Sequence, residues 1–130
     1  MSGGLVQAVR VNIQKLLFVG TAYTTPTTPI QLAVMSSASS DTAPGTEDTG
    51  GGYARQTMTF TTPTSANPSV AATSNAQTIT NMPAVTSTDV NVYDSAGTPI
   101  REAWGPMTAS KTTASGDTLA FAIAAVAINL

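Results

Sequence analysis

Apolar residues near the start of the chain recur with a helical period, between residues 5 and 19. Spacings of three and four place them on one face of a helix, and they are Leu5, Val6, Val9, Ile13, Leu16 and Leu17. Arg10 falls on the opposite face, and Gly20 follows as a C-terminal cap. Apolar residues at positions 9, 11 and 13 also alternate, so a strand is the competing interpretation. The pattern favours a helix.

After the helix the pattern changes to the two-residue period of strands. Ile30, Leu32 and Val34 alternate with Gln31 and Ala33, which predicts a short half-buried strand. Similar alternation occurs at 53–60, near 79–82, at 90–93 and at 100–104, with turns expected at 94–97 and 115–117. We therefore expect about seven short strands after one helix, a pattern typical of a β-sandwich or barrel.

The end of the chain has the clearest alternation. Leu119, Phe121 and Ile123 share one face, and the pattern continues to Leu130 after a one-residue slip at Ala124. The slip predicts a bulge or a bend. We expect this C-terminal strand to lie at a sheet edge, where it can pair with another subunit.

A stretch without any large apolar residue separates two of the predicted strands, at residues 36–52. Its Ser, Asp, Thr, Pro and Gly content predicts a long surface loop, of a kind that is usually functional or disordered. Gly50, Gly51 and Gly52 end the loop and turn it into the next strand. At 130 residues the chain is most simply one domain, with a helix arm at 1–20 and a β-sandwich at 21–130.

Composition narrows the possible chemistry. The chain has no His and no Cys, which excludes Ser–His–Asp and Cys–His catalysis and the usual zinc sites. The formal net charge of −2, with five scattered basic residues, argues against nucleic-acid binding. No apolar stretch is long enough for a transmembrane helix. We therefore expect a structural or binding protein with no cofactor, and not an enzyme.

The acidic residues offer few alternatives to that interpretation. Asp94 and Asp117 are explained by turns, so a catalytic carboxylate pair is not expected. Asp41, Glu47 and Asp48 lie in the long loop and could gather around Ca²⁺, but their spacing fits no EF-hand and the pattern favours a solvated loop. We expect no bound metal.

The helix and the loop are the candidates for partner contact, because we expect the sandwich to fold without either. The helix face can pack on the sandwich or on a neighbouring subunit, and both interpretations stay open. Trp104 is expected in the core, with a surface binding role as the alternative. The predicted interface residues are Leu5, Val9, Arg10, Ile13, Glu47, Asp48, Tyr53 and Arg55.

The order of short motifs resembles a family of small virion structural proteins from tailed bacteriophages. This family includes capsid cement or decoration proteins and tail-fibre-like proteins. The matching motifs are an N-terminal helix, Gly-Thr-Ala-Tyr-Thr at 20–24, Gly-Gly-Gly-Tyr-Ala-Arg-Gln at 50–56, the turn at 94–97, Trp-Gly at 104–105, Lys-Thr at 111–112, Gly-Asp at 116–117 and the apolar strands at 119–130. Residues 61–90 match least.

The resemblance implies a mainly β fold, a jelly-roll-like antiparallel β-sandwich with one N-terminal α-helix. It also implies a capsid cement protein that binds the outer surface of the icosahedral shell. Its partners would be the major capsid protein and itself, as a dimer or trimer, with no nucleic acid and no membrane. Such a protein is made in the host bacterial cytoplasm. The alternative within the family is a tail-fibre or baseplate adaptor.

Overall fold

The computed structural model describes residues 2–63 and 67–129, and this part of the chain is mainly β with one helix. The elements are β1 (Ser2–Leu5), α1 (Gln7–Val19), β2 (Ile30–Met35), β3 (Gln56–Met58), β4 (Val70–Ala72), β5 (Gln77–Ile79), β6 (Val85–Tyr93), β7 (Arg101–Thr113), β8 (Leu119–Phe121) and β9 (Ala127–Asn129). The predicted mainly β fold with an N-terminal helix is confirmed.

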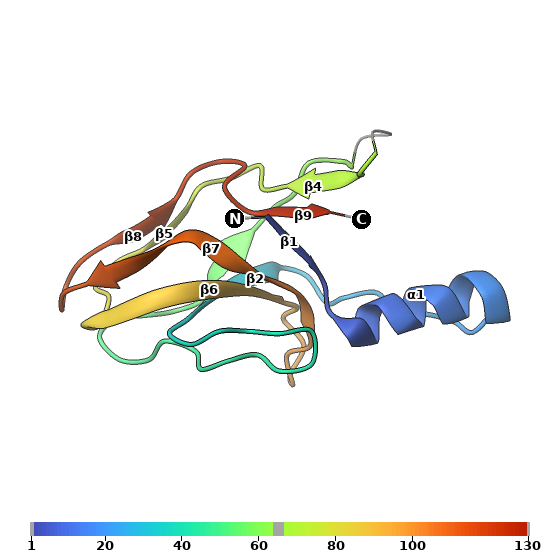
Figure 1. The fold of residues 1–130 in the computed structure, drawn as a ribbon, viewed down its shortest axis with the longest axis horizontal. Helices are drawn as coiled ribbons and strands as arrows, with labels where there is room; N and C mark the ends of the chain where they lie inside the picture. The colour runs from blue at the N-terminus through green and yellow to red at the C-terminus, as the bar shows by residue number, and fades with distance from the viewer. Residues whose placement is uncertain (1, 64–66, 130) are drawn as a thin grey trace.

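Among the described residues, the strands form a seven-stranded sheet in the order β3-β2-β6-β7-β1-β9-β4 and a two-stranded sheet of β5 and β8. The neighbouring strands are antiparallel except β1 and β9, which run parallel. The small sheet lies over part of the large one, and α1 extends away from both (Figure 1). This is the sandwich-like arrangement that was expected, whereas the jelly-roll order of strands stays a prediction.

The main core lies between the two sheets. Alternate residues of a strand share a face, so Leu32 and Val34 of β2 point the same way and meet their partners Val92 and Val90 on β6. Side chains from β5 and β8 complete the core. Its buried members are Leu32, Val34, Met58, Ile79, Met82, Val90, Val92, Ala103, Leu119, Phe121 and Val126.

The opposite face of the large sheet is covered by the loop at residues 36–52. A second apolar cluster lies on this face, formed by Ala33, Met35 and Tyr93. The loop begins directly after β2 and returns to it, since the Asp48 N–H donates to the Val34 carbonyl at 2.9 Å. The expectation that the sandwich does not need this loop is wrong, because without it a buried sheet face would be exposed to water.

The helix begins two residues later than predicted. Leu5 belongs to β1 and pairs with Ala103 of β7, so Leu5 lies in the sheet and not on the helix face. Gly20 caps the helix in a left-handed conformation, φ 73°, as predicted. Of the predicted apolar face, Val9 is the residue within α1 that is buried, while Leu17 is 67% exposed.

The C-terminal alternation is split between the two sheets. Ala124 adopts φ 63° at the predicted slip, and the chain leaves β8 there to form β9 in the large sheet. Ile123 is therefore 64% exposed and does not share the inward face of Leu119 and Phe121. β9 lies between β1 and β4 and is not an edge strand, whereas β8, the first part of the predicted strand, pairs on one side with β5 and lies at an edge of the small sheet. Leu130 lies outside the described residues.

The remaining strands differ from the predictions mostly in length. The alternation at 53–60 forms only the short strand β3, and Phe60 makes an isolated bridge to Thr73. β4 was not predicted, because its three residues show no usable alternation. The turn predicted at 94–97 lies within a longer loop between β6 and β7, in which the Asp94 carboxylate accepts a hydrogen bond from the Ile100 N–H at 2.7 Å.

The loop turns into β3 at the predicted glycines, and one of them has no room for a side chain. Gly51 has φ 57°, and a Cβ there would lie 2.5 Å from the carbonyl oxygen of Asn81. Because the obstacle is backbone, we expect Gly51→Ala to lower the free energy of unfolding by about 2 kcal/mol or more. Chemical denaturation measures this. Gly97→Ala is the control, since no atom lies within 4 Å of the corresponding position; equal stability of the two variants would contradict the prediction.

Candidate interaction surface

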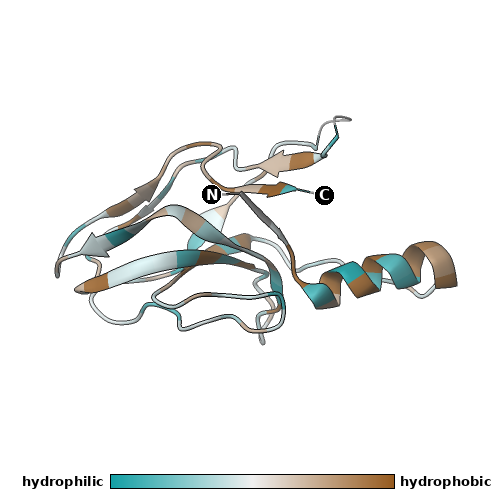
Figure 2. Cartoon of the chain, viewed as in Figure 1, coloured by the Kyte–Doolittle hydropathy of each residue, from teal (hydrophilic) through white to brown (hydrophobic). Residues whose placement is uncertain are grey.

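The far end of α1 is apolar and exposed to solvent. The exposed fractions of its last four residues are 45% for Leu16, 67% for Leu17, 81% for Phe18 and 73% for Val19. We call these four residues the apolar tip. Figure 2 shows the tip at the end of the arm that is farthest from the two sheets.

Apolar side chains surround the helix axis at the tip. Consecutive residues of a helix are rotated by about 100°, so four successive apolar residues point in all directions. A helix that is apolar on every side is stable in water only when its surroundings enclose it. The tip is therefore suited to enter a groove, rather than to lie flat on a surface.

A groove of this kind lies beside the first half of α1. Its volume is about 320 Å³, and its apolar walls include Leu5, Val9, Ile13, Ile30, Phe60 and Ile128. These residues come from β1, α1, the start of β2, the segment after β3, and β9. The groove thus combines segments that are distant in sequence, which is why no local pattern revealed it.

One acidic side chain lies in the wall of the groove. Glu102 is half-buried, and the Tyr23 hydroxyl donates a hydrogen bond to its Oε2 at 3.4 Å. Burial raises the pKa of Glu102, and the hydrogen bond from Tyr23 offsets this only in part. A cationic group that reached the groove would therefore find a poorly solvated carboxylate.

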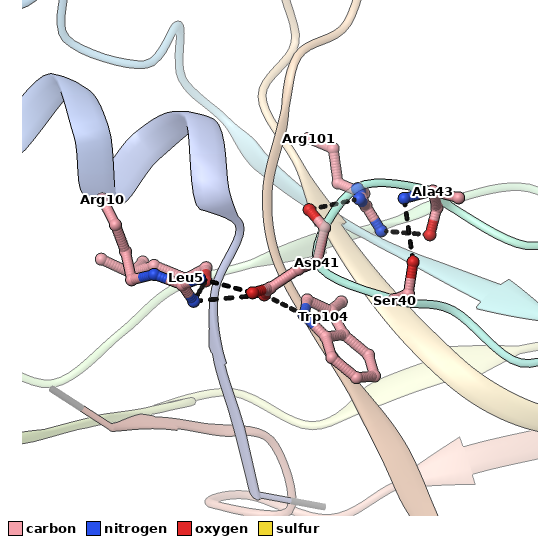
Figure 3. A network of polar contacts seen from close by, with 7 residues as sticks. All are labelled: Leu5, Arg10, Ser40, Asp41, Ala43, Arg101 and Trp104. Carbon is pink, nitrogen blue, oxygen red and sulfur yellow. Dashed lines mark hydrogen bonds and ion pairs between the residues drawn. The ribbon is translucent and has the colours of Figure 1, made fainter.

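Asp41, in the long loop, fixes the direction of the helix arm (Figure 3). Its carboxylate pairs with the Arg10 guanidinium of α1 and accepts a hydrogen bond from the Trp104 indole N–H of β7 at 3.0 Å. The same guanidinium donates to the Leu5 carbonyl at 2.7 Å. Hydrogen bonds from Arg10, and then from Trp104, lower the pKa of Asp41. Helix, loop and sheet are thus joined at one carboxylate.

Further contacts hold the loop on the sheet. Arg101 of β7 donates to the Ala43 carbonyl at 2.9 Å and to the Asp41 carbonyl at 3.1 Å. These bonds are also visible in Figure 3. Because they use backbone oxygens, they hold the course of the loop independently of its side chains.

A second polar cluster lies at the other end of the loop. Glu47 accepts two hydrogen bonds from the Arg55 guanidinium, at 2.9 and 2.7 Å, and one from the Tyr53 hydroxyl at 2.9 Å. Tyr53 in turn accepts a hydrogen bond from the Val34 N–H at 3.0 Å. The Arg55 guanidinium stacks over the Tyr93 ring, 4.0 Å from its centre. This cluster joins the loop to β2 and β6.

The eight predicted interface residues fall into two groups. Leu5, Val9, Arg10 and Ile13 lie at the groove and the base of the arm, while Glu47, Asp48, Tyr53 and Arg55 lie under or at the end of the loop. Asp48 is only 2% exposed. No observation tests these residues as an interface, so that assignment stays a prediction.

Sequence reasoning missed the apolar tip and the contacts of Asp41. The signal for the tip was present, because four consecutive apolar residues precede Gly20 at the end of an otherwise amphipathic helix. Trp104 was expected in the core but is half-buried, with its indole N–H directed to Asp41. Nothing in the local sequence connects Asp41 with Arg10 or Trp104.

The described residues contain neither a candidate metal site nor a helix that could span a membrane. In residues 2–63 and 67–129, no group of three or more acidic side chains is placed to hold a metal ion. Over the same residues, the helix is too short and too polar to cross a membrane.

The Glu47 cluster predicts a dependence of stability on pH. Burial alone would raise the pKa of Glu47, but the hydrogen bonds from Arg55 and Tyr53 outweigh it and hold the pKa below 4.5. The contribution of Glu47 to stability is therefore complete above about pH 4.5 and is lost as the pH falls through the lower pKa of the folded state. We expect Glu47→Gln to lower the free energy of unfolding by about 1 kcal/mol at pH 7 and to have little effect in acid.

Asp48 provides a control for Glu47, because the pKa of Asp48 is shifted in the opposite direction. Burial raises its pKa, although the Ser87 hydroxyl donates a hydrogen bond to it at 2.6 Å. A raised pKa means that the charged form is disfavoured in the folded state, so Asp48→Asn is expected to keep or increase stability at pH 7. Urea denaturation at pH 3 and pH 7 measures both variants. A Glu47→Gln effect of the same size at both values would contradict the assignment.

A known protein family matches almost the whole length of the chain. The family of the podophage GP4 fiber I protein gp80 matches residues 4–129. The curated proteins contain no match to the chain. The matched range includes α1, the loop and the strands from β2 to β9. The chain is therefore a phage virion structural protein and belongs to the family of the podophage GP4 fiber I protein gp80.

Proposed function

We propose that this protein is a structural subunit of a podophage fibre, which joins neighbouring subunits through its helix arm. The observation that carries the proposal is the family match over residues 4–129, because the family is described by a fiber protein. The proposed role is mechanical, and the chain performs no catalysis. Its partners are other structural subunits, including copies of itself.

The geometry of the arm supports a joining role. Monomeric proteins rarely expose a large contiguous apolar patch unless it is a binding site. The apolar tip is such a patch, and it lies on an arm held by the Arg10–Asp41 ion pair. A fixed arm loses little conformational freedom when it binds, which favours association.

The polar surface is also consistent with assembly. Only 9% of the residues are charged, so copies of this chain repel one another weakly. The capsid cement role expected from the resemblance shares these properties. The two roles differ in the number and location of the copies on the particle, and the family match favours the fibre.

Counting the copies in purified particles tests this function. We expect quantitative mass spectrometry to find this chain at a small fraction of the major capsid protein, and immunogold labelling to place it on fibres. Labelling over the whole shell, with a copy number comparable to that of the major capsid protein, would show a cement protein instead. Absence from the particles would overturn the virion role.

A further inference from the structure

We propose that the apolar tip of one copy inserts into the groove of a second copy of this chain. The inference deepens the proposed function and rests on it for its biological setting, since it names the partner of the arm. The structural evidence for the tip–groove contact is independent of the fibre assignment, because it comes only from α1 and the groove. Each molecule offers both halves of the contact, the tip and the groove.

The tip cannot fill the groove of its own molecule. Ile13 already forms part of the groove wall, and Leu17 lies one helical turn beyond it, outside the residues that line the groove. α1 contains 13 residues and is about 20 Å long, so folding the tip back would require the helix to break. It would also separate Arg10 from Asp41. A second molecule has no such constraint.

The apolar area that two copies of the chain can bury by exchanging tips is sufficient for a specific dimer. The four exposed side chains of the tip present on the order of 500 Å² of apolar surface, of which Phe18 gives the largest share. The groove has room for about two or three of these side chains, so a reciprocal exchange buries on the order of 1,000 Å² in total, at the lower end of the range of specific protein interfaces. Such a two-fold contact is closed, because each copy gives and receives one tip.

Charge favours a second copy over an unrelated apolar surface. α1 carries Arg10 and Lys15 and no acidic residue, whereas the rest of the chain has three basic and seven acidic residues. The arm is therefore positive and the body negative. Opposite charges on the two halves of a contact steer association and fix its register.

One specific ion pair follows from this arrangement. In the described part of the chain, the ion pairs are Arg10–Asp41 and Arg55–Glu47, so Lys15 and Glu102 take part in neither. Lys15 directly precedes the tip, and Glu102 lies in the wall of the groove. Insertion of the tip would bring the Lys15 ammonium near the half-buried Glu102 carboxylate of the second copy, where a cation is favourable.

Self-association of the purified chain tests the proposal. We expect sedimentation equilibrium to show a reversible dimer, and Leu17→Ser or Phe18→Ser to weaken it by roughly a hundredfold or more each, because one substitution removes two buried apolar side chains from the reciprocal dimer. Both residues are exposed in a single copy, so the variants should fold, and circular dichroism checks this. Ile123→Ser is the matched control, because Ile123 is 64% exposed but neither belongs to the tip nor lines the groove.

Cross-linking tests the geometry directly. The chain has no Cys, so a disulfide between two single-Cys variants reports one defined contact. Phe18→Cys in one copy is expected to cross-link with Pro26→Cys, in the groove, in a second copy. Ser115→Cys lies in the turn between β7 and β8, at the opposite end of the sandwich, and should give little product.

The outcomes separate this proposal from the fibre assignment. A chain that stays monomeric, tip variants that dimerise as well as the wild type, or equal cross-linking to Pro26→Cys and Ser115→Cys would each overturn tip exchange. None of these results changes the copy number or the location on particles. Conversely, a shell-wide location would overturn the fibre role and leave a measured dimer intact.

Discussion

The fold depends on the cover that the long loop provides for the outer face of β6. Ser87, Asp89 and Asn91 point to this face and are buried, and each has a hydrogen-bond partner in the loop: Ser87 donates to the Asp48 carboxylate, Asp89 accepts from the Ser39 N–H, and the Asn91 side-chain N–H donates to the Pro44 carbonyl. Burying polar groups without partners would cost several kcal/mol in total. The loop can therefore be neither apolar nor absent. A segment whose composition is typical of disorder is held in place because the sheet below it is polar.

The same loop links the sandwich to the arm. Asp41 is close to the middle of the loop, and its carboxylate contacts both α1 and β7. A change that lifts the loop from β6 would therefore also remove the contact of Asp41 with Arg10 and leave the arm attached through β1. The loop thus contributes both to the stability of the sheet and to the direction of the helix.

Alternation identified the strands with one buried face, such as β2 around Leu32, and glycine chemistry identified the helix cap at Gly20. Both signals are local. The split between β8 and β9 was harder to predict from the sequence, because nothing in the sequence indicates that Ala124 adopts a left-handed conformation. Leu5 was assigned to the helix since its spacing fits, but pairing with β7 draws it into the sheet. The groove and the Asp41 contacts join segments far apart in sequence, and single-sequence patterns contain no information on such pairs.

The parallel pairing of β1 with β9 has a consequence for how the protein forms. Ser2 pairs with Ala127 and Gly3 with Ile128, so the first described strand is held beside the last. Closing such a long loop is entropically costly, and contacts between residues so distant in sequence slow folding. The large sheet is complete only after β9 has left the ribosome. The first strand of the described chain therefore has no β9 partner until β9 has been made, and a subunit cannot complete the sheet that carries its helix arm before that point.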